Sequence, residues 1–215
     1  MLFALVALAA PAAASPAEDA LFRWADKCPS TAMQAGIYHN AGVEQLSVAE
    51  KAVFRVRTRD EGAAGLVTEA VWLVGDGCRA VGLTREAPKG GGPRKIRFVV
   101  AKDGGAPRAG EQATLLAWAA EVPWEAVPLG AAKGAPPAGK ALVGQPPAAL
   151  AGLVVTTAPG AGTTDLTALD PATGATFVLE LPGVVACSWG ADGALLGAAG
   201  APVLPSRAIL AWLGR

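Results

Sequence analysis

The fold is decided by residues 66–84, which read LVTEAVWLVGDGCRAVGLT. The apolar run 66–74 contains a single charge, Glu69, and is followed by the turn-forming triplet Gly-Asp-Gly at 75–77. A second apolar run, 78–84, follows the triplet directly. Two apolar runs joined by glycine and aspartate are typical of two antiparallel strands connected by a tight turn.

Alternating sequences flank this hairpin on both sides. Before it, residues 54–59 alternate between apolar or hydroxyl side chains and three arginines, which is the period of a half-buried strand. After it, a loop with three consecutive glycines at 90–92 precedes residues 95–100, where apolar side chains alternate with Lys95 and Arg97. Four strands in chain order, joined by short connections, predict an antiparallel meander.

Helices are predicted before the meander, after it and at the end of the chain. Residues 15–33 begin with Ser-Pro, carry two early acidic residues and present an apolar stripe. Within this segment, Pro29 either ends the helix or starts a second short one. Residues 109–122 predict a helix that Pro123 stops, and residues 205–213 predict the last one.

A second group of strands is predicted after a proline-rich connection. Residues 126–149 are rich in Ala, Gly and Pro, a composition typical of a linker or a long irregular loop. Beyond them, the turn sequences DPATG at 170–174 and GADG at 190–193 separate short apolar runs. The stretch 166–193 resembles a single blade of a quinoprotein- or WD-type β-propeller. Because a propeller needs several blades and the likeness occurs once, we interpret the stretch as hairpins.

We therefore predict an α+β fold that is predominantly antiparallel β. It consists of an N-terminal helix, a four-stranded meander, a helix, a Pro-rich connection, a second β-hairpin group and a C-terminal helix. The predicted division is a signal peptide at 1–14, an α+β subdomain at 15–125, a linker or long loop at 126–149, and a β-hairpin subdomain with the terminal helix at 150–215. The length of the connection favours two subdomains over one.

The first 14 residues indicate export. They form an apolar run that ends in three alanines and falls short of the roughly 20 residues that a membrane-spanning helix needs. Cleavage after Ala14 or after Ala17 fits the pattern. No Lys or Arg precedes the run, so an N-terminal core helix or a short membrane anchor is the alternative. We predict a secreted or periplasmic protein without a transmembrane span.

Three widely spaced cysteines fit an oxidising compartment. They are Cys28, Cys78 and Cys187, and their spacing matches no metal-binding motif. A bridge between Cys28 and Cys78 would tie the N-terminal segment to the first sheet. Three buried thiols are the alternative.

The sequence lacks the motifs of the common catalytic sites. His39 is the only histidine, which excludes a multi-histidine metal site, and no nucleophile elbow, phosphate-binding loop or zinc-protease motif occurs. An enzyme would have to use Cys28 with His39, or Asp165 with Asp170. Ordinary roles in the core and in turns explain these residues more simply, so we expect no catalytic residue, no metal and no cofactor.

The one candidate binding surface in the sequence is a cluster of positively charged residues. Residues 51–108 contain twelve Lys or Arg against six Asp or Glu, although the whole chain has a formal net charge of zero. If the strands lie in one sheet, cations from two of them are predicted to share a basic face that binds an anionic partner. The residues of this predicted face are Arg55, Arg57, Arg59, Lys95 and Arg97.

Together these features predict an exported, non-catalytic binding module of the cell envelope or secretome. Its expected partner is an exported or envelope protein or an anionic polymer. The alternatives are a binder of an anionic ligand through the basic face, and an enzyme that uses a cysteine or a carboxylate pair. Nucleic acid is not expected as a partner, because the protein is predicted to be exported, is neutral overall, and interleaves no aromatic residues with its basic ones.

Overall fold

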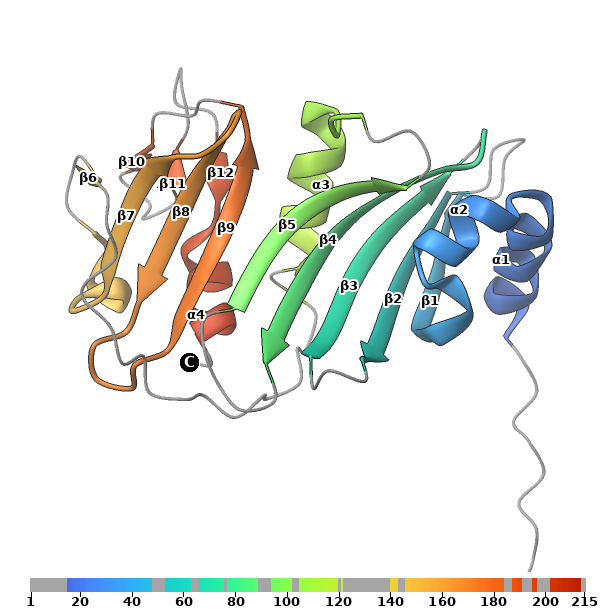
Figure 1. Ribbon diagram of the computed structural model, residues 1–215, viewed down its shortest axis with the longest axis horizontal. Helices are drawn as coiled ribbons and strands as arrows, with labels where there is room; N and C mark the ends of the chain where they lie inside the picture. Colours follow the sequence, from blue (N-terminus) through green and yellow to red (C-terminus); the bar gives the residue numbers. More distant parts are fainter. Residues whose placement is uncertain are drawn as a thin grey trace, which may run out of the picture.

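Nine strands form one sheet in the order β1-β2-β3-β4-β5-β9-β8-β7-β6 (Figure 1). In chain order they are β1 (Asn40–Ser47), β2 (Val53–Glu61), β3 (Leu66–Gly75), β4 (Arg79–Pro88), β5 (Arg94–Ala101), β6 (Lys140–Ala141), β7 (Val154–Pro159), β8 (Thr163–Leu169) and β9 (Thr176–Pro182). The computed structural model describes residues 15–47, 53–62, 66–75, 77–88, 94–101, 105–119, 121, 140–142, 146–183, 187–190, 195–196 and 202–213. The predicted signal peptide and most of the predicted linker lie outside the described residues.

The predicted meander is present and has one strand more than expected. Strands β3 and β4 pair from Leu66 opposite Pro88 to Gly75 opposite Arg79, so the hairpin predicted from residues 66–84 is the longest in the sheet. The additional strand, β1, forms the edge of the sheet and pairs with β2 through two irregularities. Its sequence, NAGVEQLS, has too few apolar residues to show a clear alternation.

A parallel pair joins the two groups of strands. Strands β5 and β9 run side by side from Arg94 opposite Phe177 to Arg97 opposite Glu180, whereas the other strand pairs of the sheet are antiparallel. The meander and the later hairpins are therefore parts of one continuous sheet (Figure 1). The predicted α+β class with mainly antiparallel pairing is confirmed.

Four α-helices flank the sheet within the described ranges. They are α1 (Pro16–Lys27), α2 (Pro29–Gln34), α3 (Ala109–Ala119) and α4 (Ser206–Leu213). Two 3-10 turns, η1 (Ile37–His39) and η2 (Ala148–Leu150), and a small sheet of β10 (Ser188–Trp189), β11 (Leu195–Leu196) and β12 (Pro202–Leu204) complete the described elements. Of the two predicted roles of Pro29, the structure shows the second, because Pro29 begins α2. None of the helices described is long and apolar enough to cross a membrane.

The sheet is covered by helices on both faces, and each face has its own core. We call the face of the nine-stranded sheet that packs against α1 and α2 the α2 face; its core, over β2–β5, includes Phe54, Trp72 and Val74. We call the opposite face the α3 face; α3 and α4 cover it, and its core includes Leu83 and Phe177. In Figure 1, α2 lies in front of the sheet, with α3 and α4 behind it.

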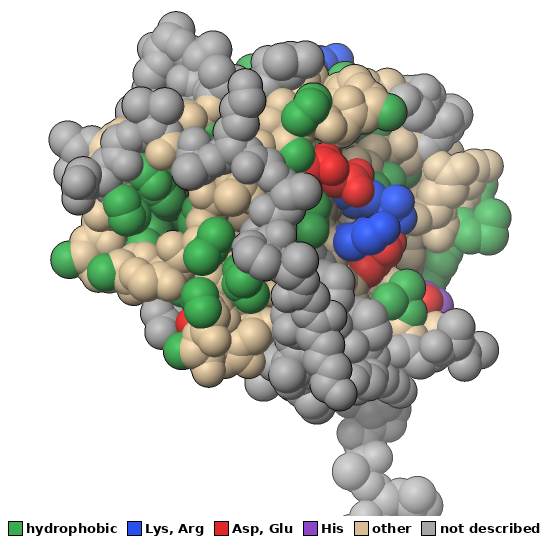
Figure 2. Space-filling view, turned by 60° about the vertical axis from the view of Figure 1, so that its left-hand side comes forward, with side chains coloured by type: hydrophobic (Ala, Val, Ile, Leu, Met, Phe, Trp, Pro, Cys, Tyr) green, Lys and Arg blue, Asp and Glu red, His purple; other side chains and the backbone are tan. Residues whose placement is uncertain are grey.

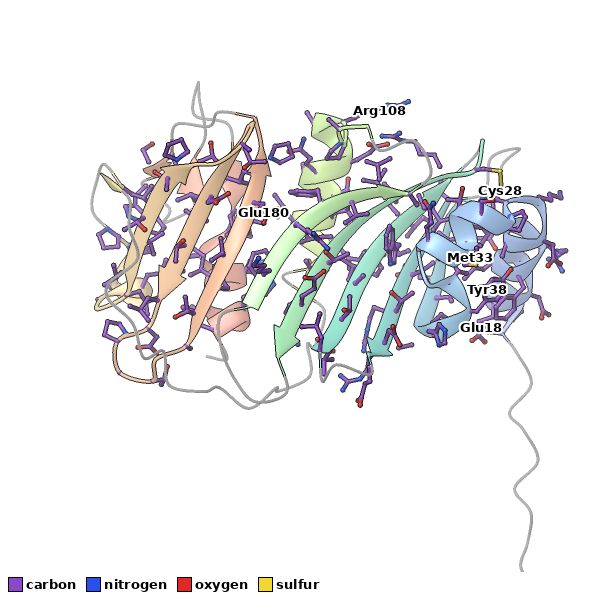
Figure 3. The ribbon with its side chains drawn as sticks, in the orientation of Figure 1. Glu18, Cys28, Met33, Tyr38, Arg108 and Glu180 are labelled. Carbon is purple, nitrogen blue, oxygen red and sulfur yellow. A yellow bond between two sulfur atoms is a disulfide. The ribbon has the colours of Figure 1, made fainter. Side chains whose placement is uncertain are left out.

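A disulfide fastens the helical segment to the sheet. It joins Cys28, between α1 and α2, to Cys78 in the turn between β3 and β4, with the two Cα atoms 5.3 Å apart (Figure 3). Two hydrogen bonds reinforce this attachment: the Thr31 hydroxyl donates to the Cys78 carbonyl at 2.9 Å, and the Trp24 indole donates to the Gly75 carbonyl at 3.0 Å. The position of α2 over the sheet is therefore fixed by covalent and polar contacts as well as by packing.

Candidate ligand-binding pocket between helix α2 and the sheet

The five cations predicted to share one basic face lie on opposite faces of the sheet. Side chains that are directly opposite each other in paired strands point to the same face, so the register between strands decides their direction. The register of β2 on β3 puts Arg55, Arg57 and Arg59 on the α3 face. The register of β4 on β5 puts Lys95 and Arg97 on the α2 face. The prediction of a single basic face is wrong, because alternation within one strand does not fix the register between strands.

Carboxylates neutralise arginines on the α3 face. Arg55 pairs with Glu44 of β1, and its guanidinium lies 5.0 Å from the ring centre of Trp118 on α3. Arg59 pairs at 3.2 Å with the buried carboxylate of Glu69. These ion pairs hold neighbouring elements together, which is a structural role. An arginine that is paired in this way attracts a bound anion less strongly.

The α2 face is acidic. The charged residues that the described strands β2–β5 and β7–β9 place on it are Asp60, Glu86, Asp165, Glu180, Lys95 and Arg97. Four carboxylates and two cations give this face a net charge of −2. Glu180 lies at the junction of β9 with β5 (Figure 3). In the space-filling view, acidic and basic side chains lie side by side in a hollow of the surface (Figure 2).

The two residue pairs considered for catalysis do not form. Asp165 points to the α2 face, whereas Asp170 is buried in the turn after β8, where it accepts the Ala172 N–H at 2.9 Å. Cys28 is bonded to Cys78, so its sulfur is not a thiol that His39 could activate. Among the described residues, no group of three or more His, Cys, Asp or Glu is placed to hold a metal ion.

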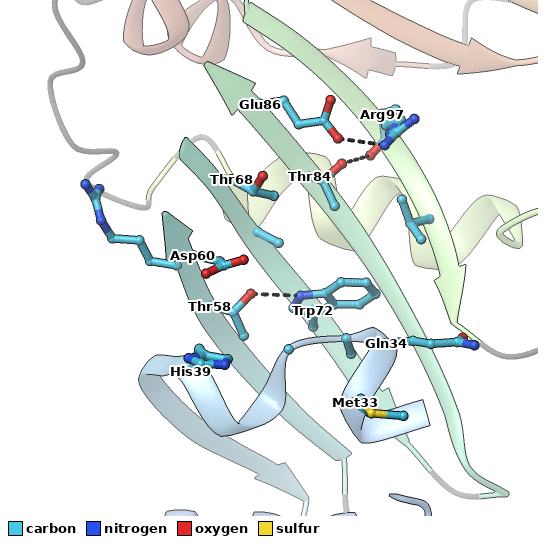
Figure 4. Close-up of a pocket in the computed structure, with 15 residues that line it drawn as sticks. Met33, Gln34, His39, Thr58, Asp60, Thr68, Trp72, Thr84, Glu86 and Arg97 are labelled. Atoms are coloured by element: carbon cyan, nitrogen blue, oxygen red, sulfur yellow. Dashed lines mark hydrogen bonds and ion pairs between the residues drawn. The ribbon is translucent and has the colours of Figure 1, made fainter. Parts of the chain in front are cut away.

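A pocket of about 390 Å³ lies on the α2 face, between the α2–η1 segment and strands β2–β5 (Figure 4). This size is within the range of small-molecule sites, roughly 300–1,000 Å³. The sheet contributes hydroxyl groups from three neighbouring strands, Thr58 of β2, Thr68 of β3 and Thr84 of β4. The helical segment contributes Met33 and His39, which are both exposed. The polar groups of the sheet therefore face a wall that the disulfide holds in place.

The indole of Trp72 forms part of the pocket floor. Trp72 is opposite Gly82 in the β3–β4 register, and a Cβ atom at position 82 would lie only 2.5–2.7 Å from three atoms of the six-membered ring. The ring therefore lies along the sheet over Gly82, a position that only a residue without a side chain leaves open. The indole N–H donates to the Thr58 hydroxyl at 3.1 Å, which fixes the ring in the plane of the floor (Figure 4).

An ion pair forms the pocket wall on the β5 side. Arg97 donates to Glu86 at 2.6 Å, and the Thr84 hydroxyl donates to the Arg97 main-chain carbonyl at 3.2 Å (Figure 4). The side chains of Arg97 and Glu86 are 48% and 21% exposed, so the pair is accessible to a ligand. Asp60 of β2 stands on the opposite side of the pocket and is exposed.

A smaller pocket of about 240 Å³ lies on the α3 face, and its charges are used within the protein. Arg79 makes two hydrogen bonds to Glu111 at 2.8 and 2.9 Å, and the Arg108 N–H donates to the same carboxylate at 2.7 Å. The bonds from Arg79, together with that from Arg108, hold the pKa of Glu111 below its ordinary value. This cluster caps α3 and joins it to β4, so we assign it a structural role.

The pocket was not predicted from the sequence, and its floor residue Trp72 is only 3% exposed. One local signal was available: a glycine inside an apolar strand marks a place where another group approaches closely. The approaching group is the Trp72 ring, and it becomes evident only from the pairing of β3 with β4. Comparison of this chain with protein-family models, curated proteins and solved structures finds no match, so no family is assigned.

Proposed function

We propose that the protein is an exported, non-catalytic binding module that holds a small ligand in the pocket between α2 and the sheet. The observation that carries this proposal is the convergence of three threonine hydroxyls and the Glu86–Arg97 ion pair on one cavity. Sites of this kind are concave, and a few placed polar groups orient the ligand. The strands that carry these groups are hydrogen-bonded along their length, which favours a preorganised site.

The charge of the α2 face narrows the class of partner. The strand residues of this face sum to a net charge of −2, and the two arginines that line the pocket are paired with carboxylates, Arg59 with Glu61 and Glu69 and Arg97 with Glu86, so little positive potential remains there for an anion. An anionic polymer is therefore a poor ligand for this pocket. A neutral or cationic small molecule meets no such barrier.

The start of α1 supports export with cleavage after Ala14. Ser15 caps the helix: its hydroxyl accepts the Glu18 N–H at 3.2 Å, and its own N–H donates to the Glu18 carboxylate at 2.9 Å. Cleavage after Ala17 would remove this cap, which is worth about 0.5–2 kcal/mol in typical helices. Cleavage after Ala14 keeps it, and the new amino group adds a positive charge beside Glu18. The disulfide is the second support, because such bonds persist in oxidising compartments.

Intact mass of the protein recovered outside the cytoplasm tests the export proposal. The expected species begins at Ser15 and carries one disulfide, which reduction and alkylation reveal as a gain of two alkyl groups. An uncleaved chain, or three thiols alkylated without reduction, would contradict export into an oxidising compartment.

A fragment screen tests the binding proposal. The folded protein is screened by ligand-observed NMR against a library of neutral and cationic polar fragments, alongside Thr68→Tyr and Thr114→Tyr variants. Thr68 is half-buried in the pocket, so a tyrosine ring there fills it, whereas Thr114 is exposed on α3 and serves as the matched control. We expect hits that Thr68→Tyr abolishes and Thr114→Tyr retains. Hits that survive Thr68→Tyr, or no hits at all, would contradict the proposal.

A further inference from the structure

We infer that the ligand of this pocket is an uncharged, polyhydroxylated molecule of the saccharide class. This inference rests on the proposed function and names the chemistry of its ligand. It follows from the pattern of donors and acceptors on the pocket walls, from the pairing of the charges there, and from the narrow apolar strip of the floor.

The three threonine hydroxyls offer both donors and acceptors to a ligand. A hydroxyl donates one hydrogen bond and accepts two. Thr58 accepts from Trp72, which leaves its O–H to donate, and Thr84 donates to a carbonyl, which leaves its oxygen to accept. Thr68 makes no hydrogen bond within the described residues, so both of its capacities are open. A ligand that satisfies all three must itself donate and accept at closely spaced points, as the hydroxyls of a sugar do.

The Glu86–Arg97 pair extends this mixed pattern. The remaining N–H groups of Arg97 donate, and the second oxygen of Glu86 accepts, at adjacent points of the same wall. Two neighbouring hydroxyls of one sugar ring can accept a hydrogen bond from Arg97 and donate one to Glu86. A carboxylate or phosphate would compete with Glu86 for Arg97 and would also face Asp60. The other arginine of the lining, Arg59, is held by Glu61 and Glu69. An ammonium group would be attracted to Asp60 but would face Arg97, so a ring with uncharged hydroxyls fits the set better than either ion.

The floor accounts for the apolar side of such a ligand. The Trp72 ring lies along the sheet, and Ala70 and Val99 line the pocket beside it. Trp72 and Ala70 are each only 3% exposed, so the floor offers a narrow apolar strip. A pyranose ring has C–H groups on its faces and hydroxyls around its rim, so its C–H groups can contact this strip while the hydroxyls reach the strands. A purely aliphatic ligand would bury the Thr68 hydroxyl without a partner and leave the open donor of Thr58 and the open acceptor of Thr84 unused, which costs free energy on burial.

Matched saccharide probes test the inference. Isothermal titration measures the binding of glucose, N-acetylglucosamine, maltose and cellobiose, with glucosamine as the cationic counterpart and glucuronic acid as the anionic one. The variants are Thr68→Val and Thr84→Val, which remove one hydroxyl each at nearly constant volume. Thr167→Val on β8 is the control, because Thr167 is half-buried on the same face of the sheet but outside the pocket.

We expect a neutral saccharide to bind, glucuronic acid to bind at least tenfold more weakly than glucose, and each pocket variant to lose about tenfold in affinity, the typical effect of one lost hydrogen bond. Thr167→Val should bind like the unaltered protein, and thermal unfolding establishes that all variants are folded. Saccharide binding that both pocket variants leave unchanged would overturn the inference. Binding of only glucosamine or glucuronic acid, lost in Thr68→Val, would refute an uncharged ligand and leave the binding function standing. If no saccharide binds but the fragment screen gives hits that Thr68→Tyr abolishes, the saccharide class is refuted and the binding function stands.

Discussion

Removal of the Cys28–Cys78 disulfide should lower the free energy of unfolding by about 4 kcal/mol. The two cysteines are 50 residues apart in the chain. In the chain-entropy model, closing a loop of that length removes about 14 cal/mol/K from the unfolded ensemble, which is about 4 kcal/mol at 25 °C. The folded state should change little in the Cys28→Ser, Cys78→Ser double variant, because Thr31 and Trp24 still bond the β3–β4 turn. The loss therefore arises from the unfolded chain.

Urea denaturation followed by far-UV circular dichroism measures this loss. The double variant and the reduced wild-type protein should unfold at the same lower denaturant concentration. The variant should keep the native spectrum in the absence of urea, which shows that the fold as a whole is retained. A difference below about 1 kcal/mol between the oxidised protein and the variant would refute the reasoning, since it would mean that the bridge does not restrict the unfolded chain.

Three further predictions concern packing, pH and the remaining thiol. Gly82→Ala would place a Cβ 2.5 Å from the Trp72 ring, and it should lower the unfolding free energy by about 1–3 kcal/mol in thermal denaturation, the usual cost of overpacking. Glu111→Gln should cost about 1–2 kcal/mol at pH 7 by loss of the charged bonds from Arg79. Because the pKa of Glu111 is lowered from 4.5 in the folded state, its contribution is complete above that value and is lost as pH falls through the folded pKa, so the wild-type and variant stabilities should converge in acid. Burial raises the pKa of the Cys187 thiol, so Ellman's reagent should detect one thiol that reacts slowly at pH 8; two or more fast thiols would contradict the disulfide.

Elements with a strong local signal could be predicted from the sequence. The β3–β4 hairpin follows from two apolar runs around Gly-Asp-Gly, and the β8–β9 turn follows from DPATG, whose Asp170 bonds its own turn. The start of α1 follows from Ser15 and Glu18, which form a capping box. In each case the decisive interactions join residues only a few positions apart.

Features that depend on distant pairing could not be predicted. The parallel pairing of β5 with β9 joins residues more than 80 positions apart, and no local sequence pattern predicts this pairing. The prediction of a single basic face is wrong for the same reason. A shift of one residue in register turns the side chains of a strand to the other face of the sheet, and the observed register places Arg57 and Arg97 on opposite faces. The pocket is a product of that register, because Trp72 meets Gly82 and the three threonines come together on one face only when β2, β3 and β4 are paired.

Methyl-resolved NMR of threonine-labelled protein tests the central claim most directly. The spectrum is recorded during titration with the tightest-binding fragment or saccharide. We expect the methyl signals of Thr58, Thr68 and Thr84 to shift together with the Trp72 indole N–H, while that of Thr114 on α3 stays in place. Shifts confined to the α3 side, or no shift at saturating ligand, would contradict the claim that the pocket between α2 and the sheet is the binding site.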